Sequence, residues 1–362
     1  MTIQKPQKRI IVLRYRFIGD TILTVPFLRN LRSAEPDAYI AWVVAPGSSE
    51  VVNGIPYINE LIFWDPVTIH ADSRGNHRTW RQKLAFIMEL RAKRFDKVYV
   101  LKRSFSSALM AIFSGAGERI GFATEGRSFL LTKPVSYRPV QHEVLSFLDI
   151  LEADGIPVVD NYLEYWTSPT EQALADELLV NNAVARAEKL VALHPFSSIP
   201  ERGWHLNNFA ALATHLAESG YRPLILGAPN DRDLFESVAD RFASTSVDLV
   251  GKNSLRVTMA LLKRCKLFVG NDSGIMHLAA AAGIPLVAIF GPQSPLKFGP
   301  WSNRATVMYR HLKCSPCRQK FFTECLPSAQ GKPECIESIE VDAVVAACNQ
   351  LLTEILSKLE DV

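Results

Sequence analysis

Short apolar runs alternate with amphipathic stretches along the chain of 362 residues. In the first half, runs rich in β-branched and aromatic residues predict strands, and stretches with a helical period fall between them. The predicted strands cover 9–15, 38–44, 61–64, 97–101 and 119–123, and the predicted helices cover 21–32, 79–94 and 142–154. Strands and helices that alternate in this way are typical of parallel α/β sheets.

A second alternation follows the stretch 155–169, which contains Pro157 and Pro169, has no helical period and is typical of an interdomain linker. The strands predicted beyond it are continuous apolar runs, as expected for strands covered by helices on both faces. They cover 189–195, 222–228, 247–251, 267–272 and 285–291, with helices at 207–218, 231–242, 255–263 and 274–282. An amphipathic helix at 341–358 could pack on either domain.

The whole pattern predicts an α/β protein of two Rossmann-like domains, whose parallel sheets face each other across a cleft. A chain of 362 residues is also longer than most domains that are built around a single hydrophobic core. We expect an N-terminal domain at 1–165, a second domain at 166–340 and a C-terminal helix at 341–362.

Composition narrows the class of protein. Hydrophobic residues make up 48% of the chain and charged residues 21%, as in a soluble globular protein. No apolar stretch reaches the ~18 residues that a membrane span needs. Arg14 and Arg16 interrupt the first apolar run before it reaches the length of a signal peptide, so we expect a cytoplasmic protein.

Charge is divided unevenly along the chain. The net charge of +3 combines +8 in residues 1–150 with −5 in the remainder. A basic first half suits an anionic partner, such as a phosphorylated substrate or an acidic membrane surface, although a solvated face without a partner is an equal alternative. The sequence lacks the dense basic stripe with interleaved aromatic residues that would indicate nucleic-acid binding.

The tip between the first predicted strand and helix raises a question of chemistry. It reads RFIGDTIL, with Gly19 followed by Asp20, where many α/β proteins carry a glycine-rich phosphate loop. The only candidate for a dinucleotide fingerprint, GAGERIG at 115–121, has the wrong spacing and precedes a strand rather than following one. Because a carboxylate repels phosphate, Asp20 either caps the helix or faces something other than phosphate.

The strongest local signal is the stretch NDSGIMHLAAAAGIPLVAIFGP at 271–292. A buried strand ends there, and the small residues Ser273 and Gly274 open an alanine-rich helix, with His277 one turn further on. The free N–H groups of a helix N-terminus bind phosphate, so this is a candidate anion site. In the alternative interpretation, Asp272 is a helix cap and His277 is a polar residue of the core.

Two further loops follow predicted strands of the second half. One carries Ser197, Ser198 and Arg202, which suit a diphosphate; alternatively it is a surface loop in which Arg202 stacks on Trp204. The other carries Asp231, which either accepts hydrogen bonds from a ribose or caps a helix.

Four of the six cysteines gather near the C-terminus, and they are Cys314, Cys317, Cys325 and Cys335. The gaps between them differ from the standard spacing of zinc ligands. A structural metal site and a redox-linked disulfide are both open, and buried or free thiols are the favoured interpretation.

Together these stretches resemble glycosyltransferase family 9, the ADP-heptose:lipopolysaccharide heptosyltransferases. The resemblance is carried by IGDTILTVPFLRNLR, by the LHP-x-SS-x3-R-x-W loop, by NDSGIMHLAAAAGIPLVAIFGP and by the cysteine segment. It extends in order and spacing along essentially the whole chain. It implies the GT-B fold, with the nucleotide sugar on the C-terminal domain and the acceptor on the N-terminal domain.

The resemblance also implies roles for single residues. Gly19 and Asp20 match the family's Gly-Asp, whose Asp is taken as the general base, and Thr21 belongs to the same acceptor-side loop. Arg202 matches a basic residue, more often Lys, that stabilises the leaving diphosphate. The other donor-side matches are Ser197, Ser198, Asp231, Asp272, Ser273, Gly274 and His277. We expect the helix N-terminus to lower the pKa of Asp20, which would make it a weak base that acts late in the transfer.

The activity that the resemblance implies is an inverting, metal-independent sugar transfer. By family default the donor is ADP-heptose, no further cofactor is required, and the acceptor is an anionic lipopolysaccharide core or related envelope glycan. Such an acceptor would bring the protein to the cytoplasmic face of the inner membrane as a peripheral protein. The alternatives are a sugar-nucleotide epimerase of similar fold, disfavoured by the Gly-Asp tip, and a non-catalytic nucleotide-sugar-binding protein, disfavoured by Asp20 and Arg202.

Overall fold

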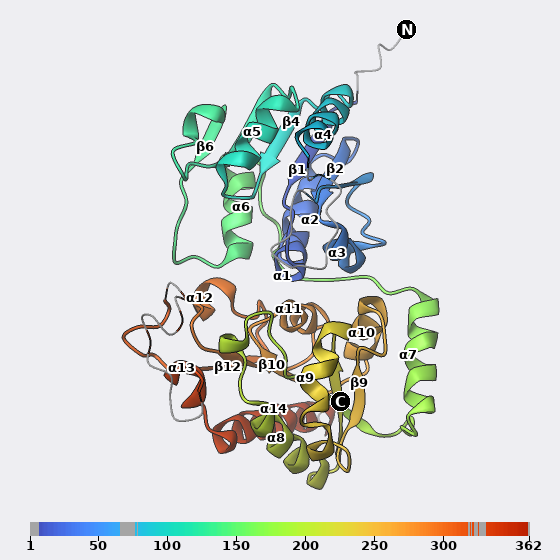
Figure 1. The fold of residues 1–362 in the computed structure, drawn as a ribbon. Coiled ribbons are helices and arrows are strands. Elements are labelled where there is room, and N and C mark those ends of the chain that lie inside the picture. The colour runs from blue at the N-terminus through green and yellow to red at the C-terminus, as the bar shows by residue number, and fades with distance from the viewer. Residues whose placement is uncertain are drawn as a thin grey trace. The chain divides into compact units, whose positions relative to one another are not determined.

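The computed structural model describes residues 7–65, 77, 79–317, 319, 321, 325 and 331–360, without the side chains of 355–360. The chain divides into two compact units, Met1–Trp166 and Thr167–Val362. Each unit is built on one sheet of six parallel strands with helices packed on its faces (Figure 1). Within the described residues, no helix has the length and apolar character needed to cross a membrane.

The first unit has the strand order β3-β2-β1-β4-β5-β6. Its strands are β1 (Arg9–Leu13), β2 (Tyr39–Val44), β3 (Glu60–Phe63), β4 (Lys97–Val100), β5 (Glu118–Phe122) and β6 (Lys133–Val135). In the central strand, Ile11 lies opposite Ala41 of β2 and Val98 of β4. The strand order therefore reverses between β1 and β4.

Helices cover both faces of this sheet. They are α1 (Ile18–Ile22), α2 (Val25–Ala34), α3 (Pro46–Ser49), α4 (Trp80–Ala92), α5 (Phe105–Phe113) and α6 (Glu143–Ala153). On one face, Ile11 and Leu13 of β1 share a core with Phe86 and Leu90 of α4. On the other, α2 packs against α6, and the ring of its Phe27 meets Tyr99 of β4 at 5.2 Å between centroids.

The second unit repeats this plan with the strand order β12-β11-β10-β7-β8-β9, so its order reverses between β7 and β10. The strands are β7 (Lys189–His194), β8 (Tyr221–Gly227), β9 (Val247–Val250), β10 (Leu267–Asn271), β11 (Leu286–Phe290) and β12 (Ala305–Tyr309). The helices are α7 (Pro169–Asn181), α8 (Leu206–Glu218), α9 (Arg232–Glu236), α10 (Leu255–Leu262), α11 (Gly274–Ala281), α12 (Pro295–Phe298), α13 (Glu334–Glu337) and α14 (Val341–Glu360). Because α14 packs on α8, β10 and β11, the C-terminal helix belongs to this unit.

Several elements differ from the sequence prediction, each for a local reason. The helix predicted at 21–32 is broken into α1 and α2, and Pro26 lies in the first turn of α2, where its missing N–H costs nothing. Pro169 likewise begins α7 rather than ending a linker, and Ser168 and Glu171 form a capping box in front of it. The helix predicted at 231–242 is helical only as α9, followed by a short 3₁₀ turn.

The packing between β10 and β7 gives a first test. A Cβ at Gly270 would lie 2.6 Å from the end of the Phe268 ring and 3.1 Å from the carbonyl oxygen of His194. Gly270→Ala should therefore lower the free energy of unfolding by roughly 1–3 kcal/mol, measured by urea denaturation. Gly47→Ala is the matched control, because a Cβ there meets nothing within 4 Å. Equal losses in both variants would contradict the tight fit at Gly270.

Candidate functional site

Polar side chains gather at the carboxyl edge of each sheet, at the point where its strand order reverses. In open α/β sheets, ligands bind outside the carboxyl ends of the strands at such points. In the first unit the reversal is between β1 and β4, and in the second it is between β7 and β10. Each unit therefore carries one candidate site, and the sequence-predicted residues distribute between the two.

The turn after β1 shapes the site of the first unit. Arg16 and Phe17 have positive φ angles of 99° and 48°, a conformation that non-glycine residues rarely adopt and that concentrates at functional sites. The hydroxyl of Thr21, which is buried, donates to the Phe17 carbonyl at 3.0 Å and so stabilises this turn. The helix α1 has Phe17 at its N-cap with no capping side chain, and Asp20 lies inside it. Asp20 is therefore not a helix cap.

Asp20 forms an ion pair in a mostly buried setting. Its Oδ1 lies 2.6 Å from Nη2 of Arg14, and the side chains are only 16% and 10% exposed. The Arg14 guanidinium also lies 5.3 Å from the centre of the Phe147 ring, so α6 helps to hold it. A second pair stands nearby in the same unit, where Arg103 contacts the buried Glu143 through two N–O contacts of 2.8 and 2.9 Å.

The expectation that the pKa of Asp20 is lowered is wrong. Burial raises the pKa of Asp20, and the charge of Glu143 adds to the rise, while Arg14 and Arg103 oppose it. Helix α1 has only five residues, and the effect of its N-terminus does not outweigh the loss of water. A raised pKa makes Asp20 a stronger base than the sequence suggested.

The surroundings of Asp20 are rich in positive charge. Lys102, which follows β4, lies 4.4 Å from the Tyr15 ring. Burial lowers the pKa of Lys102 to about 8, and the charges of Arg16 and Arg14 contribute to that shift. Burial is the larger cause of this shift, and the smaller contribution of the two arginines shows that their positive charges reach Lys102. Positive charge of this kind attracts an anion.

Asn271 organises the site of the second unit. It is the last residue of β10 and fully buried, and its Oδ1 accepts the backbone N–H of Trp204 at 2.9 Å. Its Nδ2 donates to the carbonyl of Pro195 at 2.9 Å. The amide thereby fastens the loop after β7 to the end of β10. Sequence reasoning passed over Asn271, although its place before Asp272 at a strand end was visible.

Arg202 lies in this fastened loop and is oriented by Gln319. Its Nε donates to Gln319 Oε1 at 2.9 Å, and its Nη2 donates to the same oxygen. Trp204 is buried and packs its ring on Phe209, at 5.1 Å between centroids. The guanidinium is thus held by an amide rather than by the indole proposed as an alternative. Nothing in the sequence pointed to Gln319, which is 117 positions away in the cysteine-rich segment.

Asp272 faces the other end of the guanidinium. Its Oδ2 is 3.9 Å from Nη1 of Arg202, beyond hydrogen-bond distance. Burial raises the pKa of Asp272 to about 6, and the Arg202 charge opposes the rise. The N-cap of α11 is Ser273, without a capping side chain, so Asp272 is not the helix cap of the alternative interpretation.

The remaining donor-side candidates lie around the same strand ends. Ser273 Oγ is 3.5 Å from Nδ1 of His194, whose pKa burial lowers to about 4, and His277 is buried in α11. Ser197 Oγ is buried and finds no hydrogen-bond partner among the described residues, whereas Ser198 is exposed. Asp231 follows β8. Its Oδ2 accepts a hydrogen bond from the backbone N–H of Ala228 at 2.7 Å, so one carboxylate oxygen of Asp231 already stabilises a turn of the chain.

Comparison with known proteins identifies the family of the chain. A sequence profile described as glycosyltransferase family 9 (heptosyltransferase) matches residues 83–325. The chain belongs to glycosyltransferase family 9. It is 30% identical to lipooligosaccharide heptosyltransferase 2 of Haemophilus influenzae, over 83% of this chain and 88% of that protein. The expected enzyme class, a glycosyltransferase, is confirmed.

Solved structures confirm the GT-B fold. The glycosyl transferase family 9 protein from Veillonella parvula matches with a TM-score of 0.84 at 26% identity, covering 97% of this chain and 99% of that chain. The ADP-heptose lps heptosyltransferase II of E. coli matches with a TM-score of 0.74 at 23% identity, covering 96% and 99%.

The cysteines of this family 9 glycosyltransferase are all free thiols. Cys314 and Cys317 are exposed, while Cys335 is buried, and burial raises its pKa to about 12. No disulfide joins any two of these cysteines in the structure. Within the described part of the chain, no three His, Cys, Asp or Glu side chains are arranged to hold a metal ion.

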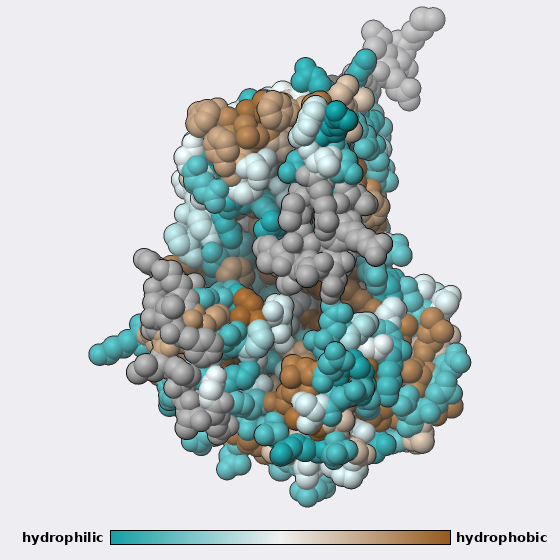
Figure 2. Space-filling model, viewed as in Figure 1, coloured by the Kyte–Doolittle hydropathy of each residue, from teal (hydrophilic) through white to brown (hydrophobic). Residues whose placement is uncertain are grey.

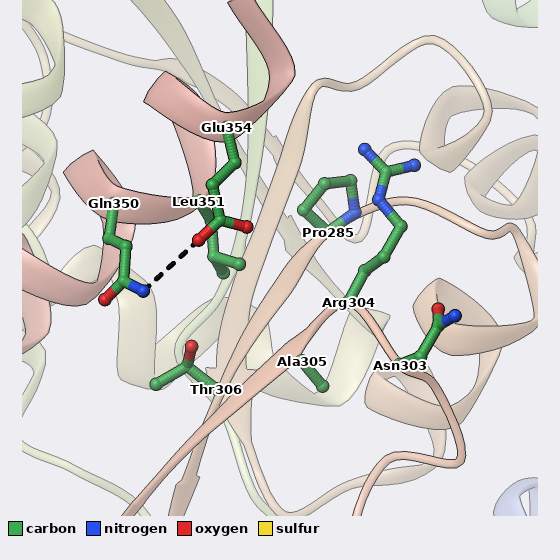
Figure 3. A pocket seen from close by; sticks show the side chains of 8 residues that line it. All are labelled: Pro285, Asn303, Arg304, Ala305, Thr306, Gln350, Leu351 and Glu354. Carbon is green, nitrogen blue, oxygen red and sulfur yellow. Dashed lines mark hydrogen bonds between the residues drawn. The ribbon is translucent and has the colours of Figure 1, made fainter. Parts of the chain in front are cut away.

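A pocket of about 330 Å³ in the second unit of the glycosyltransferase lies away from these residues (Figure 3). It is lined where β11 and β12 begin, by Pro285 and Arg304–Thr306 among others, and by Gln350, Leu351 and Glu354 of α14. The amino ends of the strands are the edge opposite to the one that carries Asn271 and Asp272. The pocket is therefore not part of the candidate site.

The buried charge of Asp272 predicts how stability depends on pH. Because its pKa rises from 3.8 to about 6 on folding, the folded state binds the proton more tightly, and stability is lost as the pH rises through this range. Replacing Asp272 by Asn should raise the free energy of unfolding by up to about 3 kcal/mol at pH 8 and by roughly half as much at pH 5.

A second carboxylate of the same unit provides the control. The pKa of Asp248 is lowered, in spite of partial burial, by its contacts with Lys252 and Arg232. Asp248→Asn should therefore lose stability at pH 8, which is the opposite sign. If Asp272→Asn instead lowered the free energy of unfolding by the same amount at pH 5 and at pH 8, the proposed cost of the buried charge would be contradicted.

Proposed function

We propose that this glycosyltransferase moves a heptose from ADP-heptose to the core of a lipopolysaccharide or lipooligosaccharide, with inversion at the anomeric carbon and without a metal ion. The names of its relatives supply the donor and the acceptor class. The observation that carries the proposal is Asp20, a buried carboxylate with a raised pKa at the strand-order reversal of the first sheet. A second unit with a cationic loop at the same place in its own sheet supplies the complementary chemistry.

Asp20 is the general base. The acceptor hydroxyl attacks the anomeric carbon, the bond from that carbon to the diphosphate oxygen breaks, and the hydroxyl proton passes to a carboxylate oxygen of Asp20. A single displacement of this kind inverts the configuration. Arg14, at 2.6 Å from the carboxylate, fixes its orientation and keeps a fraction ionised despite burial.

Arg202 stabilises the leaving diphosphate. Its Nε and one N–H of Nη2 are bonded to Gln319, and the Nη1 side is 3.9 Å from the nearest carboxylate oxygen of Asp272. The Nη1 end of the fork is thus the end available to a phosphate oxygen. Ser273, Gly274 and the N-terminal N–H groups of α11 add neutral donors beside it. Because these groups stabilise the negative charge that develops on the leaving diphosphate, a divalent metal is not required.

The acceptor is proposed to bind through charge. The positive charges of Arg14 and Arg103 act on Asp20, and Lys102 interacts electrostatically with Asp20, Arg14 and Arg16. A phosphorylated core oligosaccharide is anionic and suits this field. Because such a core is linked to lipid, we place the enzyme at the cytoplasmic face of the inner membrane.

Replacing Asp20 by Asn tests the base. The variant keeps the shape of the side chain but cannot take the proton, so kcat should fall roughly 10²–10⁴-fold while ADP affinity, measured by calorimetry, is unchanged. For the wild type, kcat/KM should fall as the pH drops through the raised pKa of Asp20. The exposed Asp37→Asn is the matched control and should behave as wild type. Full transfer activity in Asp20→Asn would refute the assignment.

A double-mutant cycle tests how Arg202 is held. Gln319→Glu keeps the acceptor oxygen but neutralises the guanidinium, so ADP should bind roughly tenfold more weakly. Gln319→Met removes the acceptor at similar size and should weaken ADP binding less. The effect of Gln319→Met should vanish in an Arg202→Ala background, because the amide of Gln319 acts through Arg202. Effects that add to the Arg202→Ala loss would show that Gln319 only maintains the fold of its loop.

A further inference from the structure

Helix α4 (Trp80–Ala92) carries an exposed apolar stripe. Trp80, Leu84 and Met88 are spaced four residues apart, which places them on one face of the helix, and they are 69%, 50% and 63% exposed. The inner face is anchored separately by Phe86 and Leu90, which are buried in the core of the first unit. The stripe is therefore not needed to attach α4 to its own sheet.

Helix α4 is stabilised by its own residues and does not depend on a partner to form. Thr79 and Gln82 make a complete capping box at its start, with the Gln82 N–H donating to Thr79 Oγ1 at 3.2 Å and the Thr79 N–H donating to Gln82 Oε1 at 2.9 Å. A preformed amphipathic surface avoids the entropic cost of folding on contact. The neighbouring α5 also exposes an apolar side chain, Phe113, which is 49% exposed. Figure 2 shows hydrophobic surface over α5.

Basic residues border the stripe. Arg81, Lys83 and Arg91 of α4 and Arg94, which follows the helix, are exposed, and Glu89 is the only acidic residue of the helix. The Arg81 guanidinium lies 5.5 Å from the centre of the Trp80 ring, so charge and aromatic surface are presented together. A tryptophan and aliphatic side chains flanked by Lys and Arg are the composition of helices that lie in the interface of an anionic bilayer.

We propose that the exposed face of α4, formed by Trp80, Leu84 and Met88 with Arg81, Lys83 and Arg91, docks on an anionic lipid bilayer. The apolar side chains enter the boundary between head groups and acyl chains, and the basic side chains pair with lipid phosphates at its surface. The inference rests on the proposed function, since a lipid-linked acceptor requires its enzyme to work at a bilayer. It adds the surface by which the first unit meets that bilayer.

The test is co-sedimentation of the full chain with vesicles, without any acceptor present. Vesicles of phosphatidylethanolamine with roughly one third phosphatidylglycerol should bind the wild type, and pure phosphatidylcholine vesicles should bind it at least about tenfold more weakly. Raising the salt concentration should weaken binding to the anionic vesicles. The triple variant Trp80→Ser, Leu84→Ser, Met88→Ser and the double variant Arg81→Glu, Lys83→Glu should each lose roughly tenfold or more in partition coefficient.

Controls separate this surface from general stickiness and from the proposed reaction. Leu174→Ser with Val180→Ser removes exposed apolar residues of α7 (46% and 71% exposed) in the other unit and should leave vesicle binding unchanged. The α4 variants should keep wild-type ADP release with a detergent-dispersed acceptor. Vesicle binding that is absent in the wild type, equal for both lipid compositions, or unaffected by the α4 variants would overturn the inference. Absence of ADP release by the wild type would instead overturn the proposed function.

Discussion

Wholly parallel sheets impose the constraint on which the rest of this molecule depends. Helices cover both faces of each sheet, so the strand interiors are apolar and the carboxyl ends of the strands are where polar side chains collect. The strand-order reversals then decide which ends adjoin: β1 with β4, and β7 with β10. Asn271 shows the cost of this arrangement, because its fully buried amide must bond the Trp204 N–H and the Pro195 carbonyl to hold the donor loop at that edge.

Two buried carboxylates with raised pKa values stand beside arginines, yet their surroundings suit them to different work. Arg14 contacts Asp20 directly, at 2.6 Å, so the two side chains form one ion pair. Arg202 is 3.9 Å from Asp272, beyond hydrogen-bond distance, and donates its hydrogen bonds to the neutral Gln319, which orients the guanidinium without neutralising it. A neutral amide can orient a cation without cancelling its charge, whereas a carboxylate orients the cation and also cancels its charge. On this basis we propose that the same pair of residue types serves as a base in one unit and as an anion site in the other.

Most of the fold was predictable because buried parallel strands are continuous apolar runs, and ten of the twelve strands found in the described residues were placed from such runs. The two that were missed, β6 and β12, are edge strands: β6 contains Pro134 and is mostly exposed, and β12 is only half-buried. The sequence located Asp20, Arg202 and Asp272 at strand ends but misjudged the pKa of Asp20, since burial and the charge of Glu143, 123 positions away, are tertiary properties. Gln319 and the Arg103–Glu143 pair were invisible for the same reason.

The basic residues that give the first half of the chain its excess positive charge lie in two separate places in the structure. A count of charges along the sequence cannot distinguish these two groups. Arg14, Arg16, Lys102 and Arg103 collect at the carboxyl edge of the sheet around Asp20, where burial lowers the pKa of Lys102 and the charges of Arg16 and Arg14 add to the shift. Arg81, Lys83 and Arg91 lie on α4, exposed to solvent, where each charge is weak alone and effective only against an extended anionic surface. A lipid-linked glycan has both an anionic saccharide and a bilayer beneath it. An enzyme for such an acceptor needs a buried cationic site for the first and an exposed basic, apolar face for the second, and this unit contains one of each.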